Sequence, residues 1–354
     1  MKRKLVFGMM GCGEIAVQTA KAVSQTDNCR IGMVQDVNED MAKDMSEKCG
    51  APYCLTWEEL LSNGSIDAVY IATPHYLHAP GAIKAAEAGK HVVVEKPMAT
   101  TLADADRMTR AARKAGVALS VAMAARYSGR AGIVRKIIGG GAIGKVVGID
   151  FGAYAFKPES YWTGGWTGRV RTDWRASKAK SGGGFFIMNL VHTVDFMRYV
   201  TGLEVTSVAA ISDTFRTKAE VEDYIVAVMR YDNGAIGQAR GATFVEGKAP
   251  QGAIEGDRII GTSGQIYTTA EAVHLFVTKP YGDHEAGKWH TIPSGSPWTG
   301  REDFMSAFAK AVLAGKDPPV NAGDGRSALE VCLAVYRSAE TGRFVRLPLR
   351  GQRR

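Results

Sequence analysis

No part of this sequence is long and apolar enough for a membrane helix, because no stretch approaches the roughly 20 apolar residues that such a helix needs. The first ten residues resemble a signal peptide in placing Lys2, Arg3 and Lys4 before apolar residues. The apolar part is short, however, lacks a small-residue cleavage site and runs directly into a glycine turn. We therefore expect a β-strand at this position, a cytoplasmic protein and no contact with a membrane.

Cysteine is scarce, since the chain has five, an odd number without the spacing of a disulfide framework. Cys49 and Cys54 lack the neighbouring ligands that would complete a zinc site. We expect no metal site, and reduced thiols that pack as small apolar side chains. The five residues are Cys12, Cys29, Cys49, Cys54 and Cys332.

Nucleic-acid motifs, internal repeats and low-complexity linkers are absent as well. The net charge is +8, but part of it belongs to a C-terminal tail with Arg343, Arg346, Arg350, Arg353 and Arg354. Without an accompanying motif this charge does not indicate nucleic-acid binding. A chain of 354 residues is long for one hydrophobic core, which predicts two domains, 1–124 and 125–354.

The sequence does contain a nucleotide-binding pattern at its start. Residues 4–16 are a short apolar run, closely spaced glycines and then a helical pattern. Gly11 would turn the chain off the strand, and Gly13 lacks the Cβ that would hold a diphosphate away. The diphosphate would bind free N–H groups at the helix start, so the predicted contacts are Gly11, Cys12, Gly13, Glu14 and Ile15. The alternative is an ordinary tight turn.

A second apolar stretch, Arg30 to Gln35, ends at the acidic residue Asp36. An acidic side chain at this point can accept hydrogen bonds from both ribose hydroxyls of NAD and would repel a 2'-phosphate. No Arg or Lys follows at once to receive that phosphate, which favours NAD over NADP. The alternative is that Asp36 only caps a turn or helix.

Strands and helices alternate through the first 124 residues, and such alternation requires a parallel sheet with helices on both faces. Beyond Arg126 strands predominate, and Asp232-Asn233-Gly234 is a strong hairpin turn. We expect an α/β fold: a doubly wound Rossmann domain, then an α/β domain with an open-faced, largely antiparallel sheet. Open faces often contact other subunits, so we expect a homodimer or homotetramer. The predicted later strands are 146–156, 205–215, 224–231, 235–244, 258–268 and 273–278.

Polar residues follow two strands of the first domain, with Thr73 and Pro74 after one and Glu95 and Lys96 after the other. Ligands of open parallel sheets bind at these carboxyl ends, so the nicotinamide should reach Lys96. Its ammonium could hydrogen-bond a substrate hydroxyl and stabilise the alkoxide-like oxygen that forms as hydride leaves. The alternative is a surface lysine paired with Glu95.

The second domain offers a triple glycine, 182–184, followed by a predicted amphipathic helix with His192 and Asp195. The glycines would allow the backbone to approach a ligand closely. His192 and Asp195 lie three residues apart on one helical face, where Asp195 could orient the imidazole. The alternative for His192 is an ordinary core residue.

Together these motifs resemble the Gfo/Idh/MocA family of glucose-fructose oxidoreductase and inositol dehydrogenase relatives, over nearly the whole chain. The resemblance implies a Rossmann domain, NAD(P) and oxidation or reduction of a secondary alcohol of a sugar, cyclitol or related polyol. It implies that Lys96 and His192 are the catalytic, proton-handling pair. It also places Thr73, Pro74, His78, Glu95, Lys96, Trp174 and Arg175 at the cofactor. The motifs that carry the resemblance are Gly11 to Ala16, Ala72 to His78, Gly89 to Pro97, Trp174 with Arg175, the triple glycine, His192 with Asp195, and 338–343.

The sequence departs from that family at Met188, where many of its dehydrogenases have an Asp four residues before the catalytic His. Without that carboxylate the basicity of His192 is not raised, so we expect a neutral imidazole near Lys96. The neighbouring Asn189 is a candidate for binding a substrate hydroxyl, and its alternative is simple polarity of the helix face.

Residues 151–181 are rich in aromatic rings and carry six cationic against two acidic side chains. Rings suit a sugar face and arginines suit a carboxylate, so we expect an anionic or aryl-bearing polyol or glycoside that contacts Tyr154, Trp162 and Arg169. The alternative is an arm that packs on another subunit or covers NAD.

The function expected from these observations is that of an NAD-dependent dehydrogenase. Two alternatives remain open at this point. One is glycoside cleavage through transient oxidation by tightly held NAD, and the other is a non-catalytic NAD-sensing regulator with the same fold.

Overall fold

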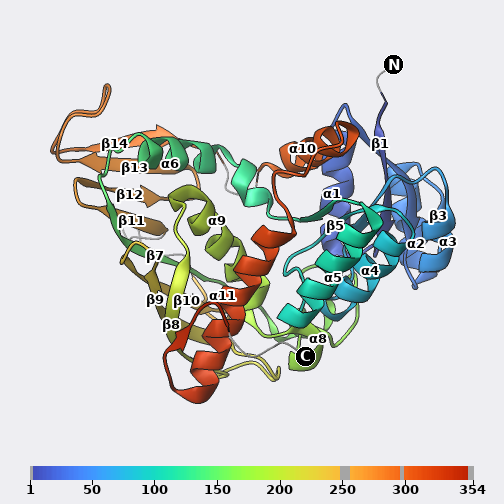
Figure 1. The fold of residues 1–354 in the computed structure, drawn as a ribbon. Helices are drawn as coiled ribbons and strands as arrows, with labels where there is room; N and C mark the ends of the chain where they lie inside the picture. The colour runs from blue at the N-terminus through green and yellow to red at the C-terminus, as the bar shows by residue number, and fades with distance from the viewer. Residues whose placement is uncertain (1–2, 248–255, 296–298, 350–354) are drawn as a thin grey trace.

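The computed structural model describes residues 3–247, 256–295 and 299–349, which form two sheets with helices packed around them (Figure 1). Residues 350–354, and with them three arginines of the basic tail, lie outside this range. The N-terminal sheet has six strands in the order β3-β2-β1-β4-β5-β6, all parallel. This confirms the predicted Rossmann domain. The strands are β1 (Leu5–Met10), β2 (Cys29–Gln35), β3 (Tyr53–Cys54), β4 (Ala68–Ile71), β5 (His91–Val94) and β6 (Leu119–Val121).

Local signals account for the helices of this sheet. The Asn38 side chain accepts a hydrogen bond from Met41 N at the start of α2, and Thr101 caps α5 through Asp104 N. Gly50 and Gly116 end the same two helices in the left-handed conformation. The helices are α1 (Glu14–Ser24), α2 (Glu39–Cys49), α3 (Trp57–Ser62), α4 (His78–Glu87) and α5 (Leu102–Ala115).

The second sheet has nine strands in the order β14-β13-β12-β11-β7-β10-β9-β8-β15, and only its β7–β10 pair is parallel. The predicted strand 258–268 is a hairpin of β11 and β12, whose turn falls at the weaker hairpin signal Thr262-Ser263-Gly264. Strand β14 had no clear signal in the sequence. The strands are β7 (Val146–Tyr154), β8 (Val205–Asp213), β9 (Tyr224–Tyr231), β10 (Ile236–Ala242), β11 (Asp257–Gly261), β12 (Gly264–Thr268), β13 (Ala272–Val277), β14 (Trp289–Pro293) and β15 (Val345–Arg346).

One face of this second sheet packs against helices and the other carries exposed apolar side chains. Helices α6 (Gly129–Gly139), α9 (Val191–Thr201) and α11 (Ala322–Thr341) lie on the covered face (Figure 1). Along β9 burial alternates strictly, so that Ala227 is buried while Val226 and Val228 are exposed. The open face expected from the sequence is therefore present.

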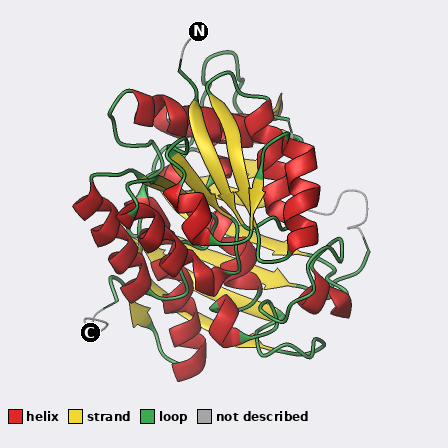
Figure 2. Ribbon diagram, turned by 90° about the vertical axis from the view of Figure 1, so that its right-hand side faces the viewer, coloured by secondary structure: helices red, strands yellow, loops and turns green. Residues whose placement is uncertain are grey.

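Figure 2 shows both sheets with helices around them. The C-terminal segment contacts elements of both domains. Helix α10 (Arg301–Leu313) packs on α1, and the ring of Phe308 lies 5.9 Å from that of Phe7 in β1. Helix α11 contacts α5, α9 and β8. The Arg301 side chain thereby reaches the first domain, where it contributes to the site described below.

Within residues 3–247, 256–295 and 299–349, no helix combines the length and apolar character needed to cross a membrane. The five cysteines are free thiols, and four of them are buried.

Candidate active site at the domain junction

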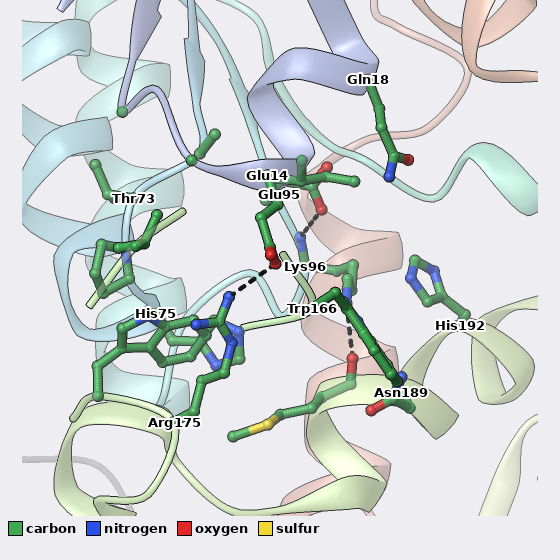
Figure 3. Close-up of a pocket in the computed structure, with 18 of the residues that line it drawn as sticks. Glu14, Gln18, Thr73, His75, Glu95, Lys96, Trp166, Arg175, Asn189 and His192 are labelled. Atoms are coloured by element: carbon green, nitrogen blue, oxygen red, sulfur yellow. Dashed lines mark hydrogen bonds and ion pairs between the residues drawn. The ribbon is translucent and has the colours of Figure 1, made fainter. Parts of the chain in front are cut away.

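A large cavity opens where the carboxyl ends of β1, β2, β4 and β5 face the second domain. It is lined by the glycine turn after β1, by residues after β4 and β5, by the segment 152–175 and by the start of the α9 region. Lys96 and His192, which come from different domains, both line it. Figure 3 shows the two side chains at the same cavity, with Lys96 between Glu95 and His192.

The glycine turn has the shape that a diphosphate requires. Gly11 has φ +90°, and a Cβ on it would lie 2.9 Å from the carbonyl oxygen of Ala72. A Cβ on Gly13 would meet only Val170, at 3.7 Å, so the backbone there borders open space. The Asp36 carboxylate accepts hydrogen bonds from Cys12 N at 2.8 Å and Asn38 N at 2.9 Å. The acidic residue after β2 therefore stands beside the turn, as an NAD ribose site requires.

Three donors of the cavity wall fit a polar cofactor. Thr73 Oγ1, Arg169 Nη2 and Arg175 Nη1 are buried and have no hydrogen-bond partner among the described residues. Buried donors are rarely left unpaired, because each one costs about 1–3 kcal/mol. Phosphate and ribose oxygens at this place would satisfy them, so the residues present fit NAD.

Asp36→Ser is expected to weaken NADH binding about tenfold, because two ribose hydrogen bonds to a charged acceptor are lost. The affinity for NADPH should rise relative to that for NADH, since the charge that repels the 2'-phosphate is gone. Fluorescence titration with both dinucleotides measures this, and Asp40→Ser, an exposed change in the same region, is the control. A variant whose ratio of the two affinities equals that of the wild type would contradict the role of Asp36.

A segment of the second domain crosses over the glycine turn and is held there by polar contacts. The Glu14 carboxylate accepts hydrogen bonds from Thr167 N at 2.5 Å and Thr167 Oγ1 at 2.8 Å, and Arg175 lies 3.5 Å from it. Figure 3 shows Glu14 reaching toward Arg175 across the cavity. Arg169 Nε donates to the carbonyl of Cys12 at 3.0 Å, and Arg169 Nη1 pairs with Asp44 at 2.5 Å. Residues 151–181 were expected either to bind substrate or to form an arm that packs on another subunit or covers NAD. The contacts with Glu14, Cys12 and Asp44 favour an arm that covers the NAD site.

The contacts of Arg169 argue against its expected role in substrate binding. We expect Arg169→Met to raise the rate of NADH release about fivefold, because it removes two contacts between the arm and the cofactor domain. Stopped-flow fluorescence measures this rate, and Arg171→Met, at an exposed neighbour, is the matched control. An unchanged release rate combined with a higher KM for acidic sugars would restore the role expected from the sequence.

Lys96 is held by a buried network at the end of β5. The Glu95 carboxylate accepts hydrogen bonds from Tyr70 at 2.5 Å and Arg301 at 2.9 Å. Burial alone would raise the pKa of Glu95, but Arg301 and Lys96 hold it at about 2, so the group is a carboxylate. Burial lowers the pKa of Lys96, which Glu95 partly offsets. Lys96 Nζ donates a hydrogen bond to the carbonyl of Met188 at 2.7 Å, and this bond joins the two domains.

His192 is a neutral base in this environment. Burial and the positive charge of Lys96 lower the pKa of His192 to about 3. This agrees with the neutral imidazole expected from Met188, whose side chain offers no charge. A neutral imidazole can accept a proton, and the resulting cation would be acidic enough to release it again.

Asp195, expected to orient His192 or bind substrate, does neither in this structure. Its carboxylate is fully buried and pairs with Arg126, with Nε at 2.8 Å and Nη2 at 2.6 Å. It does not line the cavity. The helical spacing places Asp195 on the same face as His192, but Arg126, which follows β6, binds the carboxylate instead.

The triple glycine serves packing rather than close approach to a ligand. A Cβ on Gly183 would lie 2.4 Å from the ring of Tyr336, and one on Gly184 would lie 2.2 Å from the carbonyl of Glu222. The Glu222 carboxylate accepts hydrogen bonds from Gly184 N and Phe186 N, at 2.7 and 2.8 Å. The predicted amphipathic helix is instead a π-helical turn, 186–190, followed by α9, and it is buried on most sides. The turn presents Met188 O and Asn189 to the cavity.

The remaining expected residues divide between the cavity and its surroundings. His78 ties the two polar turns together, with Nδ1 2.8 Å from Pro97 O and Nε2 3.0 Å from Thr73 O. Trp174 lines the cavity and its ring lies 4.4 Å from that of His75, a residue the sequence did not single out. Tyr154 is a half-exposed lining residue, whereas Trp162 is buried and lies behind the wall. Lys157, Tyr161 and Trp166, which belong to the aromatic and cationic segment but were not individually expected to bind substrate, also line the cavity. Arg301 lines it as well and was not singled out in the sequence.

The fold and this cavity define a two-domain oxidoreductase with an NAD-binding Rossmann domain. The family model described as oxidoreductase family, NAD-binding Rossmann fold, matches residues 5–123, and that of the GFO/IDH/MocA C-terminal domain matches residues 133–267. The chain therefore belongs to the GFO/IDH/MocA family, which confirms the resemblance found in the sequence.

Characterised relatives span the whole chain. The chain is 28% identical to myo-inositol 2-dehydrogenase of Thermotoga maritima, over 96% of this chain and 98% of that protein. It is also 28% identical to 1,5-anhydro-D-fructose reductase of Ensifer adhaerens, over 95% of this chain and 96% of that protein. The structure is also similar to the crystal structure of the WlbA dehydrogenase of Bordetella pertussis in complex with NADH and UDP-GlcNAcA, with a TM-score of 0.81 and 28% sequence identity. The match covers 98% of this chain and 100% of that chain.

Proposed function

We propose that this protein interconverts a secondary alcohol of a sugar or cyclitol and the corresponding ketone, with NAD as the redox cofactor. The observation that carries the proposal is that Lys96 and His192, from separate domains, line the same cavity as the glycine turn and Asp36. The relatives named above act on an inositol and an anhydro sugar, which supports this substrate class.

In the direction of oxidation, the chain's own residues handle the proton and the charge. Bound NAD supplies the acceptor for the hydride that leaves the carbinol carbon. His192, neutral because of its lowered pKa, accepts the hydroxyl proton. Lys96 donates a hydrogen bond to the same oxygen and stabilises its developing negative charge. Glu95 accepts a hydrogen bond from the backbone N of Lys96 at 3.2 Å and favours its charged form, while Arg301, paired with Glu95 at 2.9 Å, limits that effect.

A screen of polyols and glycosides with NAD, followed by NADH absorbance, tests the proposal. A dehydrogenase produces NADH in proportion to the oxidised product. Glycoside cleavage through transient oxidation would release sugar without net NADH, and a regulator would bind NAD and turn over nothing. Either of the latter results would replace the proposed function by one of the two alternatives.

We further propose that the open face of the second sheet joins two copies of the chain. Its exposed apolar residues lie on neighbouring strands, with Ile211 81% exposed on β8, Ile236 56% on β10 and Val228 43% on β9. Monomers seldom leave so continuous an apolar surface in water. Light scattering after gel filtration should give a dimer or tetramer, and Val226→Lys with Val228→Lys should shift it to the monomer. A monomeric wild type would contradict this.

A further inference from the structure

Lys157 is a buried lysine of the cavity for which the proposed reaction has no use. It follows β7, its side chain is part of the cavity wall and only 5% of the residue is exposed. Its ammonium donates to Asn189 Oδ1 at 2.6 Å and to the Tyr161 hydroxyl at 3.2 Å. It also lies over four aromatic rings, of which the nearest centroids are those of Tyr161 at 4.3 Å and Phe185 at 5.0 Å. All of these partners are uncharged.

Two carboxylates of the cavity wall are paired with cations other than Lys157. Glu95 pairs with Arg301 at 2.9 Å, and Glu14 lies 3.5 Å from Arg175. Among the residues that the structure describes, Lys157 forms no ion pair with a carboxylate. Burial lowers the pKa of Lys157, repulsion from Lys96 and Arg175 lowers it further, and the buried carboxylate of Glu222 partly offsets this. A buried lysine with a lowered pKa loses its proton readily, whereas an anion bound beside it would favour the charged ammonium.

Lys96 and Lys157 are held by adjacent residues of the π-helical turn. Lys96 donates to the carbonyl of Met188 and Lys157 to the side chain of Asn189. The two ammonium groups therefore stand on one wall, one assigned to the reacting hydroxyl and the other to a different part of the same substrate. The amide nitrogen of Asn189 remains free to donate to a substrate hydroxyl.

We propose that Lys157 binds a carboxylate of the substrate, so that the protein acts on sugar acids rather than on neutral polyols; this rests on the proposed function. A single ammonium matches one negative charge, whereas a phosphate dianion calls for more donors than Lys157 and Asn189 supply. Trp166 lines the cavity with its ring 4.8 Å from that of Tyr161, and the two rings provide flat surfaces for the apolar face of the sugar.

The test is calorimetric titration of the NADH-loaded protein with matched pairs of acid and neutral sugar. The probes are D-glucuronate with D-glucose, D-galacturonate with D-galactose, and D-gluconate with D-glucitol. We expect at least one acid to bind about ten- to a hundredfold more tightly than its neutral counterpart. Lys157→Met, which keeps the length of the side chain and removes the charge, should abolish this difference and leave the affinity for the neutral sugar unchanged.

Controls separate the charge of Lys157 from its packing. Lys136→Met, an exposed change on α6, should leave every affinity unchanged. Lys157→Met should bind NADH as the wild type does, which shows that the domain junction is intact. A structural role alone would weaken acid and neutral sugars equally, and that result would overturn the proposal. So would the absence of any acid preference, or tighter binding of D-glucose 6-phosphate than of D-glucuronate.

The same pairs, assayed with NAD for NADH formation, distinguish a failure of this inference from a failure of the proposed function. If neutral sugars are oxidised and Lys157→Met has no effect, the function holds and the assignment of Lys157 is wrong. If the acids bind through Lys157 but no sugar is oxidised, the assignment holds and the proposed function is wrong.

Discussion

Lys96→Ala is expected to lower kcat about a thousandfold while NADH binds with nearly wild-type affinity. Lys96 Nζ is the cation closest to the position proposed for the reacting oxygen, and a donor lost at such a position costs about 2.7–4 kcal/mol of transition-state stabilisation. The residue contributes little to the dinucleotide site, because its ammonium faces Met188 O across the junction, at 2.7 Å. Steady-state kinetics of NADH formation and a fluorescence titration measure the two quantities.

Lys136→Ala, at an exposed position of α6, is the matched control for removal of a lysine side chain. If Lys96→Ala instead loses NADH affinity and keeps kcat, Lys96 belongs to the cofactor site and the proposed mechanism fails. If kcat, NADH affinity and melting temperature all fall, the Ala variant has damaged the Tyr70–Glu95–Arg301 network. Lys96→Met, which has a longer side chain, should leave that network intact.

His192→Asn is expected to lower kcat by about two to three orders of magnitude, the usual contribution of a general base. Because the pKa of His192 is about 3, the base form is present throughout the range above that pH and is lost only as the pH falls toward it. The wild type should therefore show no fall of kcat/KM caused by His192 between pH 5 and 8.

The pH profile separates this account from the ordinary behaviour of a catalytic histidine. An acid limb near pH 6.5 that is present in the wild type and absent from His192→Asn would mean that the imidazole is protonated near neutrality. In that case burial and the charge of Lys96 would not lower the pKa of His192 in the working enzyme, and the neutral-base role would be wrong. His290→Asn, a change in β14 away from the cavity, is the control.

Local patterns were sufficient to predict the fold, the NAD cofactor and the closeness of Asp36 to the glycine turn. Alternation of strands and helices, the glycine turn and an acidic residue after β2 are properties of short segments, and each keeps its meaning wherever the rest of the chain lies. Asp36 illustrates this, because its contacts to Cys12 N and Asn38 N join residues that the Rossmann pattern itself brings together.

The substrate side depends on tertiary contacts that no local pattern contains. Asp195 shares a helical face with His192, but its partner is Arg126, which lies 69 residues earlier in the chain. Arg169 belongs to a cationic, aromatic segment, and only the fold shows that it holds Cys12 and Asp44. Lys157 was one of six cations in that segment, and nothing in the sequence distinguishes it as the buried one.

The role of the triple glycine also could not be predicted from the local sequence. Its composition is typical of a loop that approaches a ligand, yet the space that Gly183 and Gly184 leave is filled by Tyr336 and Glu222. Tyr336 lies more than a hundred residues later in the chain, so the packing reason was invisible in the local sequence.

A crystal structure with NADH and the most rapidly oxidised polyol of the screen tests the central claim most directly. We expect one hydroxyl of the polyol to lie within hydrogen-bond distance, about 2.6–3.2 Å, of both Lys96 Nζ and a ring nitrogen of His192. The nicotinamide C4 should face the carbon that bears this hydroxyl, at about 3–3.5 Å. A polyol bound elsewhere in the cavity, or a nicotinamide ring turned away from Lys96 and His192, would contradict the account.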